Sequence, residues 1–385
     1  MFQPSRRSAV LPFLAMDVMS AAAVKERQGA RVIHMEVGEP GAAAPMAART
    51  AAQRVLEQGR VGYTEALGLP ALRTRIARHY ADWYGFNLDP ARVVVTTGSS
   101  GGFILCFLAL FDVGARVAIA APGYPAYRNI LQALGLEAVD LPTSRATRYI
   151  VDADTIRRAH AERPLDGVLL MSPANPSGTM MTPEDLAAVA ATCHDLGIRF
   201  ISDEIYHGLT YEMPAETALK SSTSAVVVNS FSKYFCMTGW RVGWLVVPEN
   251  LERSMERLQQ NLSISVPTLS QAAALAAFEA RDELENIRQG YAANRAVLLE
   301  ALPRLGFTDL HPVDGAFYCY ADVSRLSNDS VAFCRRMLDE AGVAATPGID
   351  FDPERGRRTM RLSFAGPSGE IVEAVQRIEG WIPRL

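Results

Sequence analysis

Residues 229 to 244 read NSFSKYFCMTGWRVGW and continue an apolar run, SAVVVNS at 224 to 230, that is typical of a buried strand. One lysine, Lys233, stands directly after that run, with Ser230 before it and Arg241 eight residues further on. A lysine at the end of a buried strand must either reach water or be needed where it stands. The rest of the chain decides between these two possibilities.

Several other apolar runs are each followed by a turn and a helical pattern, which predicts a parallel sheet with helices on its faces. The stretch 182 to 197 predicts one of these helices, because Thr182 can cap its start, Pro183 suits its first turn and Gly197 its end. We expect a large α/β domain, with strands at 92–97, 116–122, 166–174, 199–204, 224–230 and 244–248.

The pattern changes after about residue 280, where a long polar helix at 281–302 precedes short strands with a helix between them. We interpret residues 46–280 as the large α/β domain and residues 281–385 as a smaller α+β domain. The N-terminal segment, residues 1–45, is expected to join the small domain. A length of 385 residues suits two domains, since one hydrophobic core rarely grows so large.

The N-terminal stretch at 5–23, SRRSAVLPFLAMDVMSAAA, resembles a twin-arginine export signal. Pro12 and Asp17 interrupt its apolar part, so we expect an ordinary amphipathic helix that ends at Gly29. No apolar run approaches the length that spans a bilayer, so no membrane partner is expected.

Composition and charge exclude some classes of function. The 38 basic and 42 acidic side chains give a net charge of -4, so we expect no nucleic-acid partner. The five cysteines are scattered and never spaced as CxxC, which argues against a disulfide framework and against a zinc site. We therefore expect a cytoplasmic protein without a bound metal.

Polar side chains follow the carboxyl ends of the predicted strands, where open α/β sheets bind their ligands. TTGSSGG at 96–102 opens an apolar helix, so free N–H groups and the hydroxyls of Ser99 and Ser100 would meet an anion at its positive end. Ser230 and Arg241 could contact the same phosphate. A glycine-serine turn is common after a strand, so this motif alone is a weak signal.

Four further residues complete the set at the strand ends. Asp203 would need a partner, either a cap, a salt bridge or a protonated ring nitrogen. Asn175 could simply start a turn, and Tyr124 and Tyr206 could be structural tyrosines. Together with Lys233 among phosphate ligands, they describe a site for pyridoxal 5′-phosphate, a flat phosphorylated aldehyde with which an amine forms a Schiff base.

The ordered motifs resemble those of the class I/II aminotransferases, which are pyridoxal-phosphate-dependent enzymes of fold type I similar to aspartate aminotransferase. The resemblance covers nearly the whole chain, from VGEP at 37–40 to RLSFA at 361–365, through YTEALGLPALR, TTGSSGG, PGYPAY, NPSGT, DEIY, SFSK with GWRVGW, and GAFY. It implies a mostly parallel seven-stranded sheet between helices in the large domain, plus a smaller α+β domain.

The resemblance also implies roles around the cofactor ring. Lys233 resembles the lysine that forms the Schiff base (aldimine) and moves the proton at Cα of the substrate. Asp203 would keep the pyridine nitrogen protonated, and Tyr124 would stack on the ring. Asn175 and Tyr206 would hydrogen-bond the ring oxygen.

For the phosphate and the substrate, the resemblance implies a second group of contacts. Ser99, Ser100, Ser230 and Arg241 would bind the phosphate, and Tyr63 would reach it from the neighbouring subunit of a homodimer with shared active sites. The α-carboxylate of the substrate would be held by Arg361, with the backbone of Gly38 and the side chain of Asn175 nearby.

Three functions remain open at this point. The first is transfer of an amino group from an L-amino acid to a 2-oxo acid by a ping-pong mechanism. The second is a C–S β-lyase on the same scaffold, and the third is a regulator that binds pyridoxal phosphate without catalysis. The sequence leaves the amino donor and the 2-oxo acid undecided, because no arginine is clearly dedicated to a side-chain carboxylate among Arg31, Arg128, Arg145 and Arg148.

Overall fold

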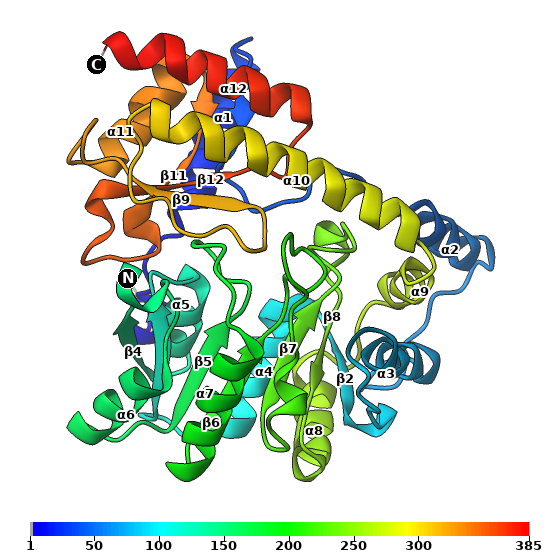
Figure 1. The fold of residues 1–385 in the computed structure, drawn as a ribbon. Helices are drawn as coiled ribbons and strands as arrows, with labels where there is room; N and C mark the ends of the chain where they lie inside the picture. Colours follow the sequence, from blue (N-terminus) through cyan, green and yellow to red (C-terminus); the bar gives the residue numbers. More distant parts are fainter. Residues whose placement is uncertain (1–2, 385) are drawn as a thin grey trace.

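The computed structural model describes residues 3–384, which form two parts stacked one above the other (Figure 1). Within these residues, the lower part holds a seven-stranded sheet in the order β2-β8-β7-β6-β5-β3-β4. Strand β8 runs antiparallel to both neighbours, and the other pairs are parallel. The predicted sheet is confirmed, and its strands are β2 (Val93–Thr96), β3 (Arg116–Ala121), β4 (Glu137–Pro142), β5 (Gly167–Met171), β6 (Arg199–Asp203), β7 (Val226–Ser230) and β8 (Gly243–Val246).

Strand β4 is the strand for which the chain gives no apolar run. Its sequence, EAVDLP, carries Glu137 and Asp140, and most of its residues are half-buried or exposed. It lies at the edge of the sheet and pairs with β3 alone among the described strands. An edge strand is covered less completely than a central one, so it lacks the continuous apolar pattern that marks its neighbours.

The sheet is buried on both faces because alternate side chains of its strands enter separate hydrophobic clusters. In β5, Val168 and Leu170 pack into one cluster and Leu169 into the other. The predicted helix at 182–197 is α7, where Thr182 and Asp185 form a reciprocal capping box. The helices of this part are α2 (Met46–Glu57), α3 (Pro70–Tyr84), α4 (Gly98–Leu110), α5 (Pro125–Ala133), α6 (Ala153–Glu162), α7 (Pro183–Asp195), α8 (Glu252–Leu262) and α9 (Thr268–Ala277).

The upper part combines a small antiparallel sheet with helices (Figure 1). The sheet has the order β11-β12-β9, and the long polar helix expected after residue 280 is α10. The elements are α10 (Arg281–Arg304), β9 (Tyr318–Asp322), α11 (Ser330–Arg336), β10 (Val343–Ala344), β11 (Thr346–Pro347), β12 (Thr359–Ser363) and α12 (Ser368–Trp381).

The N-terminal segment contacts this upper part. Helix α1 (Leu14–Arg27) is the helix expected from the sequence, and β1 (Ile33–His34) pairs in parallel with β10. Asp350 accepts hydrogen bonds from the first two backbone N–H groups of α1, at 2.9 and 3.2 Å. These bonds hold the start of α1 against the segment of the upper part that contains Asp350. The domain boundaries at residues 45 and 280 stay predictions.

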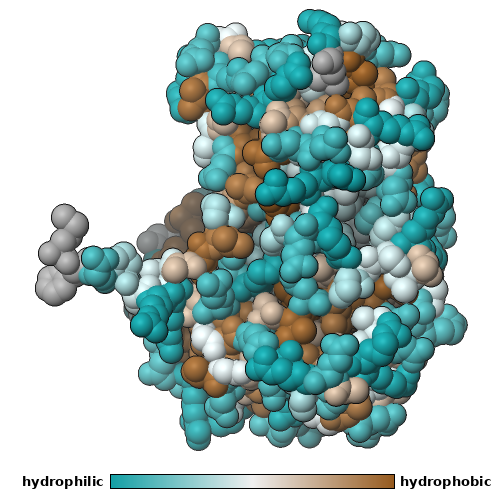
Figure 2. Space-filling view, turned by 90° about the vertical axis from the view of Figure 1, so that its left-hand side faces the viewer, coloured by the Kyte–Doolittle hydropathy of each residue, from teal (hydrophilic) through white to brown (hydrophobic). Residues whose placement is uncertain are grey.

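Hydrophilic residues dominate the face seen in Figure 2, and hydrophobic residues appear between them in separate areas. In the part of the chain that the structure describes, no helix is both long enough and apolar enough to cross a membrane.

Candidate active site

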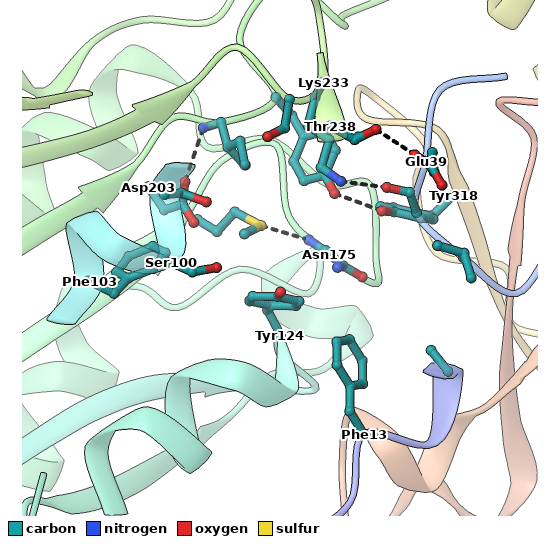
Figure 3. A pocket seen from close by; sticks show the side chains of 18 of the residues that line it. Phe13, Glu39, Ser100, Phe103, Tyr124, Asn175, Asp203, Lys233, Thr238 and Tyr318 are labelled. Carbon is teal, nitrogen blue, oxygen red and sulfur yellow. Dashed lines mark hydrogen bonds between the residues drawn. The ribbon is translucent and has the colours of Figure 1, made fainter. Parts of the chain in front are cut away.

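A pocket of about 550 Å³ lies at the carboxyl ends of the parallel strands, where the lower and upper parts meet (Figure 3). Parallel strands end at the same edge of a sheet, so residues far apart in the sequence converge there. The residues predicted from the sequence that line this pocket are Gly38, Ser99, Ser100, Tyr124, Asn175, Asp203, Tyr206, Lys233, Arg241 and Arg361.

Lys233 extends into this pocket from the turn after β7. Its Nζ donates a hydrogen bond to the backbone carbonyl of Gly38, which belongs to the N-terminal segment. Burial, together with the positive charge of Arg361, lowers the pKa of Lys233 to about 8. The amine is therefore much easier to deprotonate than a lysine in water, as a nucleophile or base must be.

Asp203 is buried at the end of β6. Its Oδ1 accepts from the backbone N–H of Ile205 at 3.0 Å, and its Oδ2 accepts from the hydroxyl of Tyr127. Burial raises the pKa of Asp203 to about 7, although both hydrogen bonds favour the ionised form. Tyr127 was not predicted as a partner of Asp203, although it is the second tyrosine of the PGYPAY motif that contains Tyr124.

Arg361 connects β12 of the upper part to the turn after β5. Its Nη1 donates to Asn175 Oδ1 at 2.9 Å, and its Nη2 donates to the backbone carbonyl of Glu36. The guanidinium lies 4.3 Å from the ring centre of Tyr318 and 4.7 Å from that of Phe351. Buried Nε has no hydrogen-bond partner among the described residues, so a donor remains available beside the pocket.

Tyr206 and Tyr318 form a pair of hydroxyls at the pocket, with their oxygen atoms 2.7 Å apart. Burial raises the pKa of both groups, so both stay protonated as donors near neutral pH. A Cβ on Gly38 would overlap the hydroxyl of Tyr318. A larger residue at position 38 would therefore displace the Tyr318 hydroxyl from the pocket. Tyr318 is a further site residue, which the GAFY motif contains but which was assigned no role from the sequence.

The start of α4 and Arg241 meet at one end of the pocket. Gly98 has a φ of +72°, and a Cβ there would lie 2.5 Å from Arg241 Nη2. Arg241 is itself held in a left-handed conformation, and its Nη1 donates to the backbone carbonyl of Thr238 at 2.8 Å. The guanidinium thus lies beside the helix start that carries Ser99 and Ser100, which is a favourable arrangement for an anion.

The two serines before Lys233 differ in their surroundings. Oγ of Ser230 lies 2.9 Å from Ser232 Oγ and 3.1 Å from the carbonyl oxygen of Val242, so its one proton is donated to one of these two groups within the protein. Ser232 lines the pocket, whereas Ser230 lies behind it. The predicted phosphate contact of Ser230 stays a prediction, and Ser232 was missed although it stands in the same SFSK motif.

Tyr124 is the residue before α5, and its ring lies over the pocket in Figure 3. Phe13 approaches it edge-on from the N-terminal segment, with ring centres 5.9 Å apart. Met16 of α1 also lines the pocket. Neither contribution from the N-terminal segment could be predicted, because it depends on how α1 is fixed by Asp350.

Tyr63 does not line the pocket of its own chain and is 81% exposed. Its predicted contact with the phosphate of a neighbouring subunit is therefore neither supported nor contradicted within one chain.

Comparison with known proteins identifies the family. The sequence profile described as "Aminotransferase class I and II" matches residues 30–378. The chain belongs to the class I and II aminotransferases. This aminotransferase is 51% identical over 381 residues to a valine–pyruvate aminotransferase of Mycobacterium tuberculosis, with 98% of both chains covered. It is 31% identical to an aspartate/prephenate aminotransferase of Thermus thermophilus, over 97% of both chains.

Solved aminotransferase structures share the fold. A crystal structure of an aminotransferase from Mycobacterium tuberculosis matches with a TM-score of 0.97 and 50% identity over the whole of both chains. Aspartate aminotransferase from Thermus thermophilus with maleate matches with a TM-score of 0.92 and 31% identity, covering 98% of this chain and 99% of that one. The predicted family and fold type I architecture are confirmed.

This aminotransferase is an enzyme that transfers amino groups with pyridoxal 5′-phosphate, as predicted. The β-lyase alternative is not favoured, because these relatives are named for amino transfer. The pocket residues suit the cofactor. Among residues 3–384, no cation lies within hydrogen-bonding distance of buried Asp203, so a protonated ring nitrogen would supply the charge that this carboxylate lacks.

Proposed function

We propose that this aminotransferase takes an apolar aliphatic L-amino acid such as valine as its donor and pyruvate as its acceptor. The similarity to the valine–pyruvate aminotransferase supports this substrate class. The observation that carries the proposal is the charge of the pocket lining, which offers no spare cation for a substrate side chain.

Three cationic side chains line the pocket among the described residues. The neighbours of each one indicate a role other than binding a carboxylate on the substrate side chain. Lys233 lies at the Gly38 carbonyl, Arg241 lies at the start of α4, and Arg361 contacts Asn175. The remaining charged lining residues are Asp203 and Glu39, both acidic. A carboxylate on the substrate side chain would therefore meet repulsion rather than a partner.

The walls left for a substrate side chain are apolar. Phe13 and Met16 come from the N-terminal segment, and Met171 comes from the end of β5. Burial of a valine side chain against such groups contributes roughly 1.5–3 kcal/mol. The hydroxyl of Thr238 already donates to Glu39, so its proton is not available to hydrogen-bond a hydrophilic substrate side chain.

In this proposal, Arg361 holds the α-carboxylate of the amino acid, with Asn175 and the Gly38 backbone beside it. A fixed carboxylate limits rotation about Cα and presents its C–H bond to Lys233. The neutral amine of Lys233 then takes the Cα proton as a general base, which its lowered pKa permits near neutral pH.

Other residues of the chain hold the cofactor. Bound pyridoxal phosphate supplies an aldehyde that accepts the amino group and an electron-poor ring that stabilises charge at Cα. Asp203 keeps a proton on the ring nitrogen, and Tyr124 covers the ring. Asn175 and Tyr206 bond the ring oxygen, and the phosphate is bound by Ser99, Ser100, Ser230, Arg241 and the partner's Tyr63.

The role of Tyr63 requires a homodimer. Tyr63 belongs to the loop after α2, and exposed apolar residues accompany it on that loop and on nearby segments. The carbonyl of Gly62 accepts from Thr268 Oγ1, so this loop and the start of α9 form one surface. Support for burial of this surface comes from its exposed side chains, Met46, Leu56, Val61, Leu262 and Ile264.

We also propose a cytoplasmic location and a division of the chain near residues 45 and 280. The five cysteines are all free and buried, which suits a reducing compartment. Pairing of β1 with β10 supports assignment of residues 1–45 to the small domain.

The test is a panel of amino donors with pyruvate as acceptor, in which the L-alanine formed is measured. We expect kcat/KM for valine to exceed that for aspartate by about tenfold or more, since one side-chain burial and one unpaired charge separate the two substrates. Equal or faster turnover of aspartate would overturn the proposed substrate class but not the family assignment.

A further inference from the structure

A second cavity, of about 280 Å³, lies outside the catalytic pocket, between α3 and the start of α10. Among the described residues, no lining residue is shared by the two. Figure 1 shows the start of α10 beside α9, above α3. The cavity is lined in part by Tyr234 and Phe235, the two residues directly after Lys233.

The walls of this cavity are largely aromatic. Trp83 and Phe278 line it together with Phe235, and His79 lies 4.3 Å from the indole of Trp83 between ring centres. Burial lowers the pKa of His79 to about 3, so its imidazole is neutral at physiological pH. Their rings can pack against a small apolar group, while the rest of the lining is polar and charged.

Two guanidinium groups line the same cavity. Arg75 lies 4.3 Å from the ring centre of Phe278, and its buried Nη1 has no hydrogen-bond partner within residues 3–384. Its closest carboxylates, Glu279 and Asp82, are 3.7 and 3.8 Å away, beyond hydrogen-bonding distance. Arg281 is exposed and makes no ion pair or hydrogen bond to another described residue. An anionic ligand would satisfy both groups.

Asp82 adds a carboxylate to this lining. Its contacts with Arg75 and Arg78, at 3.8 and 3.7 Å, are too long for hydrogen bonds, so the Asp82 carboxylate can still accept hydrogen bonds from a ligand.

The cavity therefore has two cationic groups, one anionic group and aromatic rings around a small volume. This combination matches a zwitterion with an apolar substituent. We propose that this cavity binds a free α-amino acid with a small apolar side chain. Its carboxylate contacts Arg75 and Arg281, its ammonium contacts Asp82, and its side chain packs against Trp83.

The location of the cavity links its occupancy to the catalytic lysine. Tyr234 donates to Glu285 of α10 at 2.8 Å, so the turn that carries Lys233 is tied to the helix that forms the cavity. A ligand in contact with Tyr234 and Phe235 therefore touches the segment that sets the position of Lys233. Occupancy would regulate the enzyme through the concentration of free amino acid, which goes beyond the proposed function and does not depend on it.

The test is equilibrium dialysis of radiolabelled L-valine with the enzyme in its pyridoxamine 5′-phosphate form, which has no aldehyde to react with an amino acid. Arg281→Ala and Arg75→Met remove the two guanidiniums, and the methionine keeps an apolar stem over Phe278. Arg158→Ala removes an exposed helix arginine elsewhere, as a matched control. Arg361→Ala reports binding in the catalytic pocket.

We expect one valine per chain that persists in Arg361→Ala and Arg158→Ala and weakens by about tenfold or more in Arg281→Ala and Arg75→Met. Because Arg281 is exposed, its variant keeps the result interpretable if Arg75→Met fails to fold. Binding that is absent, that disappears in Arg361→Ala, or that is unchanged in Arg281→Ala would overturn the proposal.

Discussion

Nη1 of Arg361 lies 2.9 Å from Oδ1 of Asn175, so a strand of the upper part and a turn of the sheet domain are joined at the pocket. The bond orients the amide of Asn175 with its oxygen toward Arg361. The Nδ2 group of Asn175 then remains as a donor for the cofactor ring oxygen. Carboxylate binding at Arg361 and cofactor binding at Asn175 are thereby expected to depend on each other.

Substitution of Arg361 by lysine tests the carboxylate site. Lysine keeps the charge but lacks the forked geometry that pairs with a carboxylate through two parallel bonds. We expect kcat/KM for amino acid and 2-oxo acid to fall together by roughly 10- to 100-fold, which corresponds to about 1.4–3 kcal/mol. Steady-state kinetics measure this, and the absorption band of bound pyridoxal phosphate serves as the control. A variant with unchanged kcat/KM would place the carboxylate elsewhere.

The stability of the cofactor-free protein depends on Asp203. Burial raises its pKa from 3.8 to about 7, so between these pH values the folded chain holds a proton that the unfolded chain has lost. The free energy of unfolding therefore falls as pH rises from 4 to 7, by up to roughly 4 kcal/mol. Asp203→Asn should remove this contribution and be the more stable protein at pH 7.

Urea unfolding of both proteins without cofactor, at pH 4.5 and pH 7, measures the difference. Burial also raises the pKa of Glu204, to about 8, so its contribution has the same sign and appears in both proteins. The comparison between the two proteins isolates Asp203. If the free energy of unfolding changes with pH equally in wild type and Asp203→Asn, Asp203 is not a buried carboxylate without a cationic partner.

Gly98→Ala tests the anion site at the start of α4. The added Cβ would lie 2.5 Å from Arg241 Nη2 and would sit on a backbone with φ +72°. We expect affinity for pyridoxal phosphate to fall by about tenfold or more, since Arg241 must move. Gly290→Ala in α10 is the matched control, because nothing lies within 4 Å of its Cβ. Equal affinity of both variants for pyridoxal phosphate would show that Arg241 does not bind the phosphate.

Glu39→Gln tests the origin of specificity. Glu39 lines the pocket and accepts from Thr238, and glutamine can keep that hydrogen bond without the charge. We expect kcat/KM for aspartate to rise by roughly tenfold, whereas kcat/KM for valine changes little. Competition assays with both donors measure the ratio. An unchanged ratio would show that Glu39 does not exclude acidic substrates.

Much of the fold could be predicted because its signals are local. The central strands are apolar runs buried on both faces, and α7 carries its own caps. Strand β4 gave no such signal, because an edge strand is only partly covered. For the site, strand ends converge by topology, which is why Asp203 and Lys233 could be placed together from sequence.

The remaining site residues depend on contacts that no local pattern encodes. Tyr127 reaches Asp203, at the end of β6, from helix α5, and Tyr318 reaches Tyr206 from the upper part. Phe13 enters the pocket only because Asp350, far along the chain, fixes the start of α1. Such contacts arise from three-dimensional packing, so the structure was needed to find them.

The most direct test of the central claim follows the absorbance of the purified holoenzyme in single turnovers, with valine, alanine, phenylalanine and aspartate in turn. We predict that valine converts the pyridoxal band to the pyridoxamine form, that pyruvate restores it, and that Lys233→Ala lacks this cycle while it remains folded. A pyridoxal band that valine leaves unchanged, or a cycle that persists in Lys233→Ala, would contradict the account.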